Sequence, residues 1–288
     1  MFPLVSICIP TFNGEAYLQE ALDSILQQNS RDFEVIISDD QSTDDTLKIA
    51  NKFKEAADFP VKIYNHSPKG IGANWNNCIK KAKSKYIKFL FQDDVLYPTC
   101  IKKMVSVLES YPKIALVASK RDFIVESSAS SALTSWLDKY KDLQATLSNE
   151  ENNVLVLDKS LFKSIEFLNS PFNKIGEPSV VMFRSNIIKK VGMFNEELKQ
   201  ILDYEFYYRI LKRYKVAILP EKLAGFRVHG LQESEKNNMN NVNEKFIFDK
   251  ILYRFFFRYL RIDHKKELFL KFNPLLRKII KLISKPAS

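Results

Sequence analysis

The sequence predicts an α/β fold in which helices flank a central β-sheet, followed by a helical C-terminal extension. Over residues 1–120, short runs of β-branched and aromatic residues alternate with helical patterns, as a sheet with parallel strands requires. The chain has 288 residues, 45% of them hydrophobic, which is enough to bury a full core and excludes a disordered or fibrous protein. Its positive charge is concentrated near the C-terminus, which sets that end apart.

The predicted elements follow one another along the body of the chain. Strands are expected at residues 4–9, 33–38, 61–64, 86–91, 114–117, 179–183 and 216–219. Helices are expected at residues 15–28, 43–57, 74–83, 99–110, 159–168, 186–191 and 203–212. Residues 127–153 are serine-rich and charged with weak periodicity, which indicates a mobile excursion. We therefore expect one domain over residues 1–242, with halves at 1–120 and 154–230, and a basic helical tail over 243–288.

The distribution of charge separates this tail from the body. Residues 246–288 contain 11 Lys or Arg and 3 Asp or Glu, whereas residues 1–245 contain 33 and 31. Although the formal net charge is +10, a nearly neutral body argues against a nucleic-acid-binding core. The tail therefore predicts an electrostatic contact of its own.

An amphipathic pattern in the tail predicts contact with an anionic membrane surface. At about 100° per residue, two sets of side chains separate on a helix. The apolar arc contains Leu275, Leu276, Ile279, Ile280, Leu282 and Ile283, and the basic arc contains Arg277, Lys278, Lys281 and Lys285. Upstream, residues 246–261 are rich in aromatics and arginine, as suits a headgroup interface. The alternative is a helix packed on the domain with its basic side in water.

The remaining composition indicates a cytoplasmic protein. Cys8, Cys78 and Cys100 are far apart, with neither disulfide nor zinc-site spacing. No uninterrupted apolar run approaches the roughly 20 residues of a spanning helix, and the run at residues 4–9 lacks a basic segment before it and ends at Pro10. We expect a protein that lies peripherally on the inner face of the cell membrane.

Polar residues follow the predicted strands, where an open parallel sheet binds its ligands. The residues at these strand ends, most of them polar, are Pro10, Thr11, Phe12 and Asn13, then Asp39 and Asp40, then Asn65 and His66, and finally Asp93 and Asp94. Such residues also cap helices and form turns, and that alternative stays open for each site alone. Two Asp pairs on one sheet edge repel unless a cation intervenes, and Mg²⁺ or Mn²⁺ takes carboxylate oxygens together with those of a diphosphate. A nucleotide diphosphate is therefore the expected ligand.

A glycine pair offers a competing phosphate motif. Residues 70–75 read GIGANW, with two of the three glycines of a dinucleotide fingerprint. Because they follow the third predicted strand and not the first, the motif argues against a Rossmann dehydrogenase.

Five segments together carry a family resemblance. They read VSICIPTFNGEAYLQEALDSILQQ, FEVIISDDQSTDDT, YIKFLFQDDVLYP, VGMFNEELKQILDYEFYYRILKRY and LAGFRVH. Over residues 3–229 the sequence resembles the family 2 glycosyltransferases of the bacterial surface-polysaccharide type. The resemblance implies the GT-A fold, a Rossmann-like mixed sheet that binds a nucleotide, with an acceptor half after residue 170.

The resemblance also implies a role for each matching position. The nucleotide contacts are Pro10, Thr11, Phe12, Asn13, Asp39, Asp40, Asn74, Asn76 and Asp93, with Phe12 against the base and Asp93 towards the ribose. Asp94 and His229 would bind the metal, Asp203 would be the catalytic base, and Glu177 and Arg227 would meet acceptor and phosphate. Asp203 could also cap its helix, and the two roles are compatible. The sequence departs from the family pattern at Trp75, Phe91 and Leu202, where an Arg and two acids are usual.

Together these residues predict an inverting, metal-dependent glycosyltransferase with Mn²⁺ or Mg²⁺ as cofactor. It would move a sugar from a nucleotide-diphosphate sugar such as a UDP-sugar to a saccharide or lipid-linked acceptor, while Asp203 deprotonates the acceptor hydroxyl. The resemblance implies a part in surface glycan assembly, such as lipopolysaccharide or capsule. Two alternatives remain open. One is a membrane-docked nucleotide-sugar-binding protein that has lost catalysis, and the other is a sugar-nucleotide pyrophosphorylase, which would carry a glycine-rich loop after its first strand.

Overall fold

A mixed β-sheet forms the centre of the protein. The computed structural model describes residues 3–67, 69–125, 131–148, 150–151, 154–230, 232 and 242–275, and ten strands in these ranges form one sheet. Their order is β3 (Val61–Asn65), β2 (Phe33–Asp39), β1 (Val5–Thr11), β4 (Tyr86–Phe89), β9 (Val181–Arg184), β6 (Ile114–Val125), β10 (Lys215–Val228), β8 (Val154–Leu157) and β7 (Glu150–Glu151), while β5 (Val95–Leu96) pairs with β10. The first four are parallel, whereas β9 is antiparallel to β4 and β6. This arrangement confirms the predicted mixed α/β sheet.

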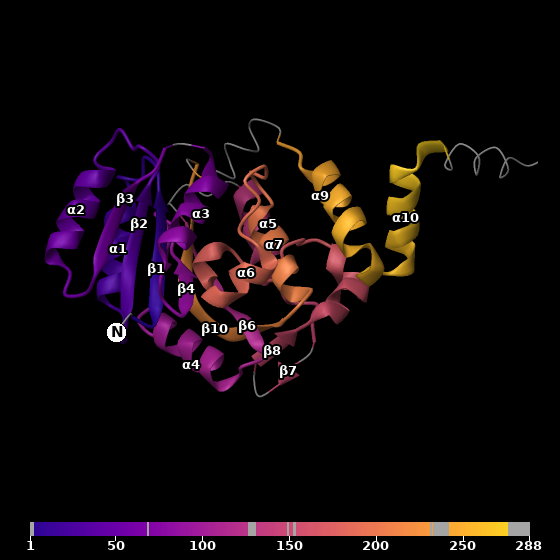
Figure 1. Ribbon diagram of the computed structural model, residues 1–288, viewed down its shortest axis with the longest axis horizontal. Coiled ribbons are helices and arrows are strands. Elements are labelled where there is room, and N and C mark those ends of the chain that lie inside the picture. The colour runs from indigo at the N-terminus through magenta and orange to yellow at the C-terminus, as the bar shows by residue number, and fades with distance from the viewer. Residues whose placement is uncertain are drawn as a thin grey trace, which may run out of the picture.

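Helices cover the sheet and its ends (Figure 1). They are α1 (Leu18–Leu26), α2 (Thr46–Ala56), α3 (Ile71–Lys81), α4 (Cys100–Ser110), α5 (Ser131–Tyr140), α6 (Ile188–Val191), α7 (Leu202–Leu211), α9 (Lys245–Ile251) and α10 (Ile262–Phe272). α3 packs on β1 and β2, α4 on β6 and β9, and α7 on β10. In α1, Leu18, Ala21, Leu22 and Ile25 recur at helical spacing and are buried, so one apolar stripe holds this helix on the core.

Two segments differ from the sequence prediction. Residues 131–140 form α5 where the composition predicts a mobile excursion, because Trp136 packs on Phe123 of β6 with ring centroids 5.6 Å apart. Residues 127–130, 149 and 152–153 of that excursion lie outside the described residues. The helix predicted at 159–168 is two 3₁₀ turns, Lys159–Lys163 and Ile165–Leu168, because Ser164 between them is extended and its hydroxyl accepts the N–H of Glu166.

The strands β6 and β10 are longer than predicted, and this extension shapes the site. Both continue beyond the apolar runs that end at residues 117 and 219, and they pair in parallel as far as Val125 and Val228. The additional strand residues include Arg121 on β6 and Arg227 on β10, and they place both at the same edge of the sheet.

The C-terminal helices pack on the domain. Figure 1 shows α9 and α10 at the end of the molecule opposite α2. The buried apolar side chains of α9, α10 and the segment between them belong to the common core and are Phe248, Leu252, Phe256, Leu260 and Leu268. One side of residues 245–272 therefore packs on the domain, while Phe255 and Ile262 stay exposed. Apart from Leu275, the predicted amphipathic helix lies outside the described residues, and none of the helices described is long and apolar enough to cross a membrane.

Candidate active site

The carboxyl ends of β1 and β2 bring the first predicted site residues together. Pro10 is buried within β1 opposite Ser38, and Thr11 ends the strand. The Thr11 hydroxyl donates to Asp39 Oδ1 at 2.8 Å. Asn13 follows in the left-handed region at φ 45°, where Asn is tolerated, and its N–H donates to Ser42 Oγ at 2.8 Å. The two turns are thus fastened to each other.

The two carboxylates of the first Asp pair have different surroundings. Asp39 is fully buried and accepts from the Thr11 hydroxyl and from both the N–H and the hydroxyl of Ser42, the last two at 2.9 and 2.6 Å. Asp40 lies with Oδ1 2.7 Å from His66 Nδ1, and its side chain is 10% exposed. Asp39 therefore organises the turns, and Asp40 with His66 is the more accessible pair.

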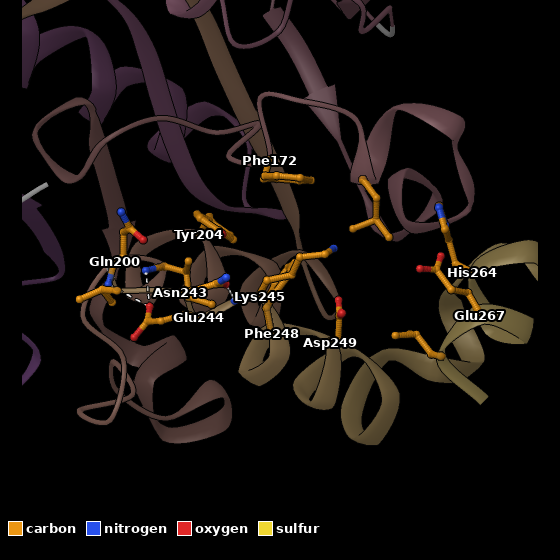
Figure 2. A pocket seen from close by; sticks show the side chains of 14 residues that line it. Phe172, Gln200, Tyr204, Asn243, Glu244, Lys245, Phe248, Asp249, His264 and Glu267 are labelled. Atoms are coloured by element: carbon orange, nitrogen blue, oxygen red, sulfur yellow. Dashed lines mark hydrogen bonds between the residues drawn. The ribbon is translucent and has the colours of Figure 1, made fainter. Parts of the chain in front are cut away.

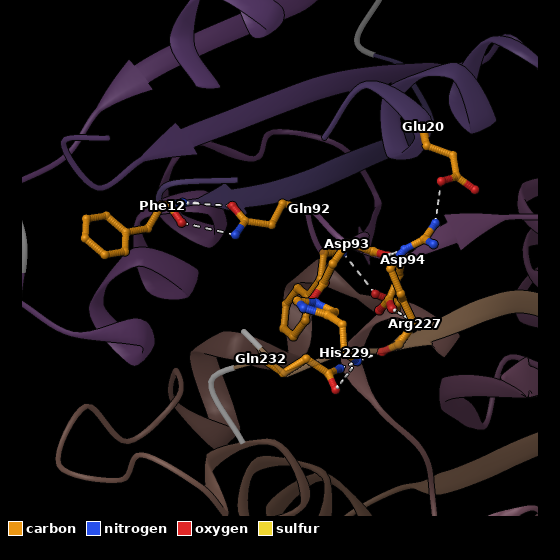
Figure 3. A network of polar contacts seen from close by, with 10 residues as sticks. Phe12, Glu20, Gln92, Asp93, Asp94, Arg227, His229 and Gln232 are labelled. Carbon is orange, nitrogen blue, oxygen red and sulfur yellow. Dashed lines mark hydrogen bonds and ion pairs between the residues drawn. The ribbon is translucent and has the colours of Figure 1, made fainter. Parts of the chain in front are cut away.

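Phe12 is held by its backbone while its ring stays half-exposed. Its N–H donates to Gln92 Oε1 at 2.9 Å and its carbonyl accepts from Gln92 Nε2 at 3.1 Å. Figure 3 shows the ring pointing away from Gln92, and 49% of Phe12 is exposed. Gly14 permits this packing, because a Cβ there would lie 2.4 Å from Gln92 Oε1. The ring is therefore presented on a fixed turn.

The second Asp pair meets the end of β10 (Figure 3). Asp93 Oδ2 lies 3.1 Å from His229 Nε2, and the Arg227 N–H donates to Asp94 Oδ1 at 3.0 Å. The Arg227 guanidinium donates to the Asp93 carbonyl at 3.0 Å and forms an ion pair with Glu20. The structure thus brings Asp93, Asp94, Arg227 and His229 together, and the Arg227 charge is directed to Glu20.

Asp94 carries an unsatisfied buried oxygen. The residue is fully buried, and its Oδ2 has no hydrogen-bond partner among the described residues. Burial, with the adjacent Asp93 charge, raises the pKa of Asp94 well above its usual range. Beneath it, burial lowers the pKa of Lys88 to about 8, and this ammonium donates to the Ser179 carbonyl. A buried carboxylate oxygen without a partner is an atom that a cation would satisfy.

Residues near the start of α3 contact two different parts of the domain, the turn after β1 and the second half. Asn74 Nδ2 donates to the Thr11 carbonyl at 3.2 Å, and its buried Oδ1 has no partner among the described residues. Asn76 both donates to and accepts from the Phe194 backbone at 2.9 Å, while the Trp75 ring packs edge-on to Phe194 at 5.0 Å. Asn74 therefore remains at the predicted site, and Asn76 and Trp75 fasten the two halves.

Asp203 is the carboxylate of the second half. α7 begins at Leu202 with Ile201 as its N-cap, so Asp203 does not cap this helix. Asn173 Nδ2 donates to Asp203 Oδ2 at 3.0 Å, and Oδ1 is buried with no partner in the described chain. Burial raises the pKa of Asp203 to about 7, and the negative charge of Glu177 adds to this.

Glu177 lies between the two halves of the site. Its carboxylate is 2.7 Å from Arg121 Nε, and its charge acts on the pKa of both Asp94 and Asp203. Arg121, 5% exposed, reaches this position from the extended end of β6. The predicted acceptor residue therefore belongs to a partly buried ion pair near the predicted base.

Comparison with known proteins decides the family. The family model described as "Glycosyl transferase family 2" matches residues 6–165, more than half of the chain. The chain belongs to glycosyl transferase family 2. An uncharacterized protein of Mycobacterium tuberculosis is 30% identical over 77% of this chain and 66% of its own length. An uncharacterized glycosyltransferase of Rickettsia prowazekii is 30% identical over 80% of this chain and 65% of its own length, so the chain spans just under two thirds of these curated relatives.

Solved structures share the fold of this family 2 chain. S. aureus TarS 1-349, in complex with UDP-GlcNAc, superposes with a TM-score of 0.61 at 20% identity, covering 93% of this chain and 71% of TarS 1-349. The mannosyltransferase PcManGT from Pyrobaculum calidifontis, in complex with GDP-Man and Mn²⁺, gives a TM-score of 0.60 at 15% identity, covering 99% and 82%. The likeness confirms the GT-A type of architecture.

The residues of this family 2 member fit a divalent cation that is shared with a substrate. No group of three or more His, Cys, Asp or Glu within the described ranges is arranged to hold a metal. Mg²⁺ and Mn²⁺ are commonly bound by one or two carboxylates together with substrate phosphates, so a complete protein cage is not required. The unpartnered Oδ2 of Asp94, and Asp93 beside His229, are donors that these ions accept.

Several residues of the site gave no sequence signal. The Tyr17 ring packs on His229 with centroids 4.6 Å apart, and the Arg227 guanidinium lies over the same ring at 4.8 Å. These contacts join the start of α1 to the end of β10, which are far apart in the sequence, so no local sequence pattern predicts them. Arg121 would have been a candidate had the strand before it been predicted to its full length.

Proposed function

We propose that the protein is an inverting glycosyltransferase that moves a sugar from a nucleotide-diphosphate sugar to a hydroxyl of a saccharide or lipid-linked acceptor. The proposal is carried by three buried oxygens that lack partners among the described residues, namely Asn74 Oδ1, Asp94 Oδ2 and Asp203 Oδ1. Buried polar atoms are nearly always hydrogen-bonded, so unsatisfied ones on both halves of a site indicate a polar ligand there. The negative charge of Glu177 raises the pKa of both Asp94 and Asp203, so it couples the two halves electrostatically.

The donor half supports recognition of a nucleotide. The half-exposed Phe12 ring offers a stacking surface for the base, and Asp40 with His66 offers polar contacts near it. Asp93, Asp94 and His229 would hold Mn²⁺ or Mg²⁺, which, when bound, supplies counter-charge to the diphosphate. TarS was solved with UDP-GlcNAc and PcManGT with GDP-Man, which supports a nucleotide-sugar donor, and we propose a UDP-sugar.

The acceptor half supports a single displacement. The acceptor oxygen attacks the anomeric carbon as its bond to the diphosphate breaks, and the proton of the acceptor hydroxyl passes to Asp203. Asn173 holds Asp203 Oδ2, which leaves Oδ1 for that proton. A base with a pKa of about 7 accepts a proton near neutral pH more readily than an ordinary carboxylate.

Release of free nucleotide from a panel of UDP- and GDP-sugars, with and without Mn²⁺, tests the proposal. We expect slow, Mn²⁺-dependent hydrolysis of one donor class, reduced at least tenfold by Asp93→Ala. The matched control is Asp45→Asn, which changes a 61% exposed carboxylate paired with Lys48 and should leave the rate unchanged. Binding without turnover would favour the catalytically impaired binding protein, and pyrophosphate-dependent release of sugar 1-phosphate would favour a pyrophosphorylase.

We also propose that the C-terminal segment contacts an anionic membrane surface, with the protein on the inner face of the cell membrane. Phe255, Ile262 and Leu275 are 60, 67 and 75% exposed, in a segment whose Lys and Arg outnumber its acids by 11 to 3. Co-sedimentation with phosphatidylglycerol-containing vesicles tests this. We expect Ile262→Glu to weaken it and Leu26→Glu, on α1, to leave it unchanged. Equal binding to purely zwitterionic vesicles would refute the electrostatic part. A part in surface-polysaccharide assembly rests on the family resemblance.

A further inference from the structure

A cavity of about 660 Å³ lies between the start of α7 and the C-terminal helices (Figure 2). Its wall includes Phe172, Tyr204, Phe248, Asp249, His264 and Glu267. None of these residues belongs to the donor half, and the volume falls within the roughly 300–1,000 Å³ of sites that hold small ligands. The cavity is therefore a second candidate binding site.

The cavity adjoins the proposed base. Phe172 immediately precedes Asn173, whose amide donates to Asp203, and Tyr204 immediately follows Asp203. Both Phe172 and Tyr204 line the cavity. Part of the cavity wall is therefore formed by the direct sequence neighbours of Asn173 and Asp203.

The far wall is fixed to the base helix by a buried carboxylate. Glu244, 5% exposed and immediately before α9, accepts the backbone N–H groups of Lys199, Gln200 and Ile201 at 2.7, 3.0 and 3.0 Å. These amides lead directly into α7. Three charge-assisted hydrogen bonds to a buried carboxylate fix the distance between α9 and the base. The cavity is thus held at a set position relative to Asp203.

The lining combines aromatic faces with oxygen acceptors. Figure 2 shows the Phe172 ring on one side of the space, Asp249 opposite, and His264 with Glu267 at one end. Phe172 is 45% exposed, and His264 Nδ1 is buried with no hydrogen-bond partner among the described residues. Aromatic rings pack on the apolar C–H face of a sugar ring, and carboxylate and imidazole groups bond its hydroxyls.

The charges of the lining give no net attraction for an anionic ligand. The described wall contains three acidic residues, Glu244, Asp249 and Glu267, and one lysine, Lys245. Three backbone amides bind the Glu244 carboxylate, and Lys271 pairs with Asp249 at 2.5 Å. Lys245 and Glu267 are then the charged Lys and Glu side chains of the described wall that remain to meet a ligand. Because Lys245 and Glu267 carry opposite charges, the wall has no net positive charge to attract a phosphate or a uronate, whereas a neutral polyhydroxyl ring needs none.

We propose that this cavity binds a neutral saccharide unit of the acceptor, remote from the hydroxyl that reacts at Asp203. The acceptor role rests on the proposed function, but saccharide binding in the cavity does not. The cavity would then select acceptors by the sugar that lies next to the reacting unit.

Saccharide binding to the full chain tests the proposal. Ligand-observed NMR would be run with neutral di- to tetrasaccharides and with uronate-containing counterparts, in the presence of saturating UDP and Mn²⁺ to occupy the donor site. We expect a neutral oligosaccharide to bind, and Phe172→Ala and Glu267→Gln each to weaken it about fivefold, as one lost contact of about 1 kcal/mol implies. Phe255→Ala, which removes a 60% exposed ring outside the cavity, should change nothing.

Three outcomes would overturn the proposal. They are the absence of binding by any neutral oligosaccharide, binding of the anionic ones alone, and equal weakening by Phe172→Ala and Phe255→Ala. Glu267→Gln changes a surface carboxylate and serves as the second variant if Phe172→Ala does not fold. Donor hydrolysis, measured separately, reports on the proposed function, so a chain that binds saccharide in the cavity but hydrolyses no donor would refute the transferase and keep the saccharide site.

Discussion

Replacing Asp203 by Asn removes the proposed base while keeping its size. With a pKa of about 7, Asp203 is about one tenth ionised at pH 6 and about nine tenths at pH 8. Sugar transfer by the wild type should therefore rise about tenfold over this range, whereas a carboxyl with the ordinary pKa would give a flat profile. Asp203→Asn should lower transfer at pH 8 by about 10²- to 10⁴-fold and abolish the dependence.

The assay separates transfer from donor binding. Product formation is followed at saturating donor and Mn²⁺ from pH 6 to pH 8, and UDP affinity is measured by calorimetry on the same samples. UDP affinity should be the same in both proteins, because Asp203 lies in the proposed acceptor half. Full transfer by Asp203→Asn, or a wild-type rate that stays level between pH 6 and pH 8, would refute the base assignment.

The same carboxyl links folding stability to pH. Its pKa is about 7 in the folded chain and near 3.8 when unfolded, so the unfolded state loses this proton first as pH rises. The stabilising effect is complete below about pH 4, is lost progressively up to about pH 7 and changes little above that. The ceiling is about 4 kcal/mol, and solvent access lowers it. The Tm of Asp203→Asn minus that of the wild type should therefore grow between pH 4 and pH 7, and a constant difference would contradict this.

Three further substitutions probe the donor turn and the base helix. Phe12→Ala should weaken UDP binding, measured by calorimetry, about fivefold or more, because a ring stacked on a base contributes about 1–3 kcal/mol. Phe12→Tyr should retain UDP affinity. Equal UDP affinities of Phe12→Ala and the wild type would exclude stacking. Gly14→Ala should lower both Tm and UDP affinity, because its Cβ meets Gln92, and adding Gln92→Ala should recover part of the Tm if that contact is the cause. Glu244→Ala should lower kcat for transfer and shift the pH profile of the rate, while UDP affinity stays unchanged. The control Glu197→Ala changes an exposed carboxylate and should alter neither kcat nor the pH profile. An unchanged kcat in Glu244→Ala would show that Glu244 does not position the base.

The sequence predicts those parts of the fold that local patterns determine. β1 and β2 are continuous buried runs and lie within one or two residues of the predicted strands. The polar residues after them could be placed at one edge because parallel strands share a direction. The extensions of β6 and β10 were missed because polar residues such as Lys120, Arg121 and Asp122 interrupt the apolar run. Their strand conformation follows from pairing with each other, which is a long-range cause.

The roles within the site follow the same division. The family resemblance predicts roles for Asp93, Asp94, Asp203 and His229, and the structure places His229 against Asp93 and the Arg227 N–H against Asp94. Asn76 was predicted to contact nucleotide, but its amide is taken up by the Phe194 backbone 118 residues away, and we leave it out of the proposed donor site. Partnerships across such separations depend on the packed halves and cannot be derived from spacing.

The ion pair between Glu20 and Arg227 has a consequence for the order in which the site forms during synthesis. The two residues are 207 positions apart, on α1 and near the end of β10. A ribosome that has released the first half of the domain has produced both Asp pairs, but neither Arg227 nor His229 has yet emerged. The nascent chain therefore carries four carboxylates without the strand that anchors Asp94 and leads to His229 beside Asp93, and the proposed donor site becomes complete only when β10 enters the sheet.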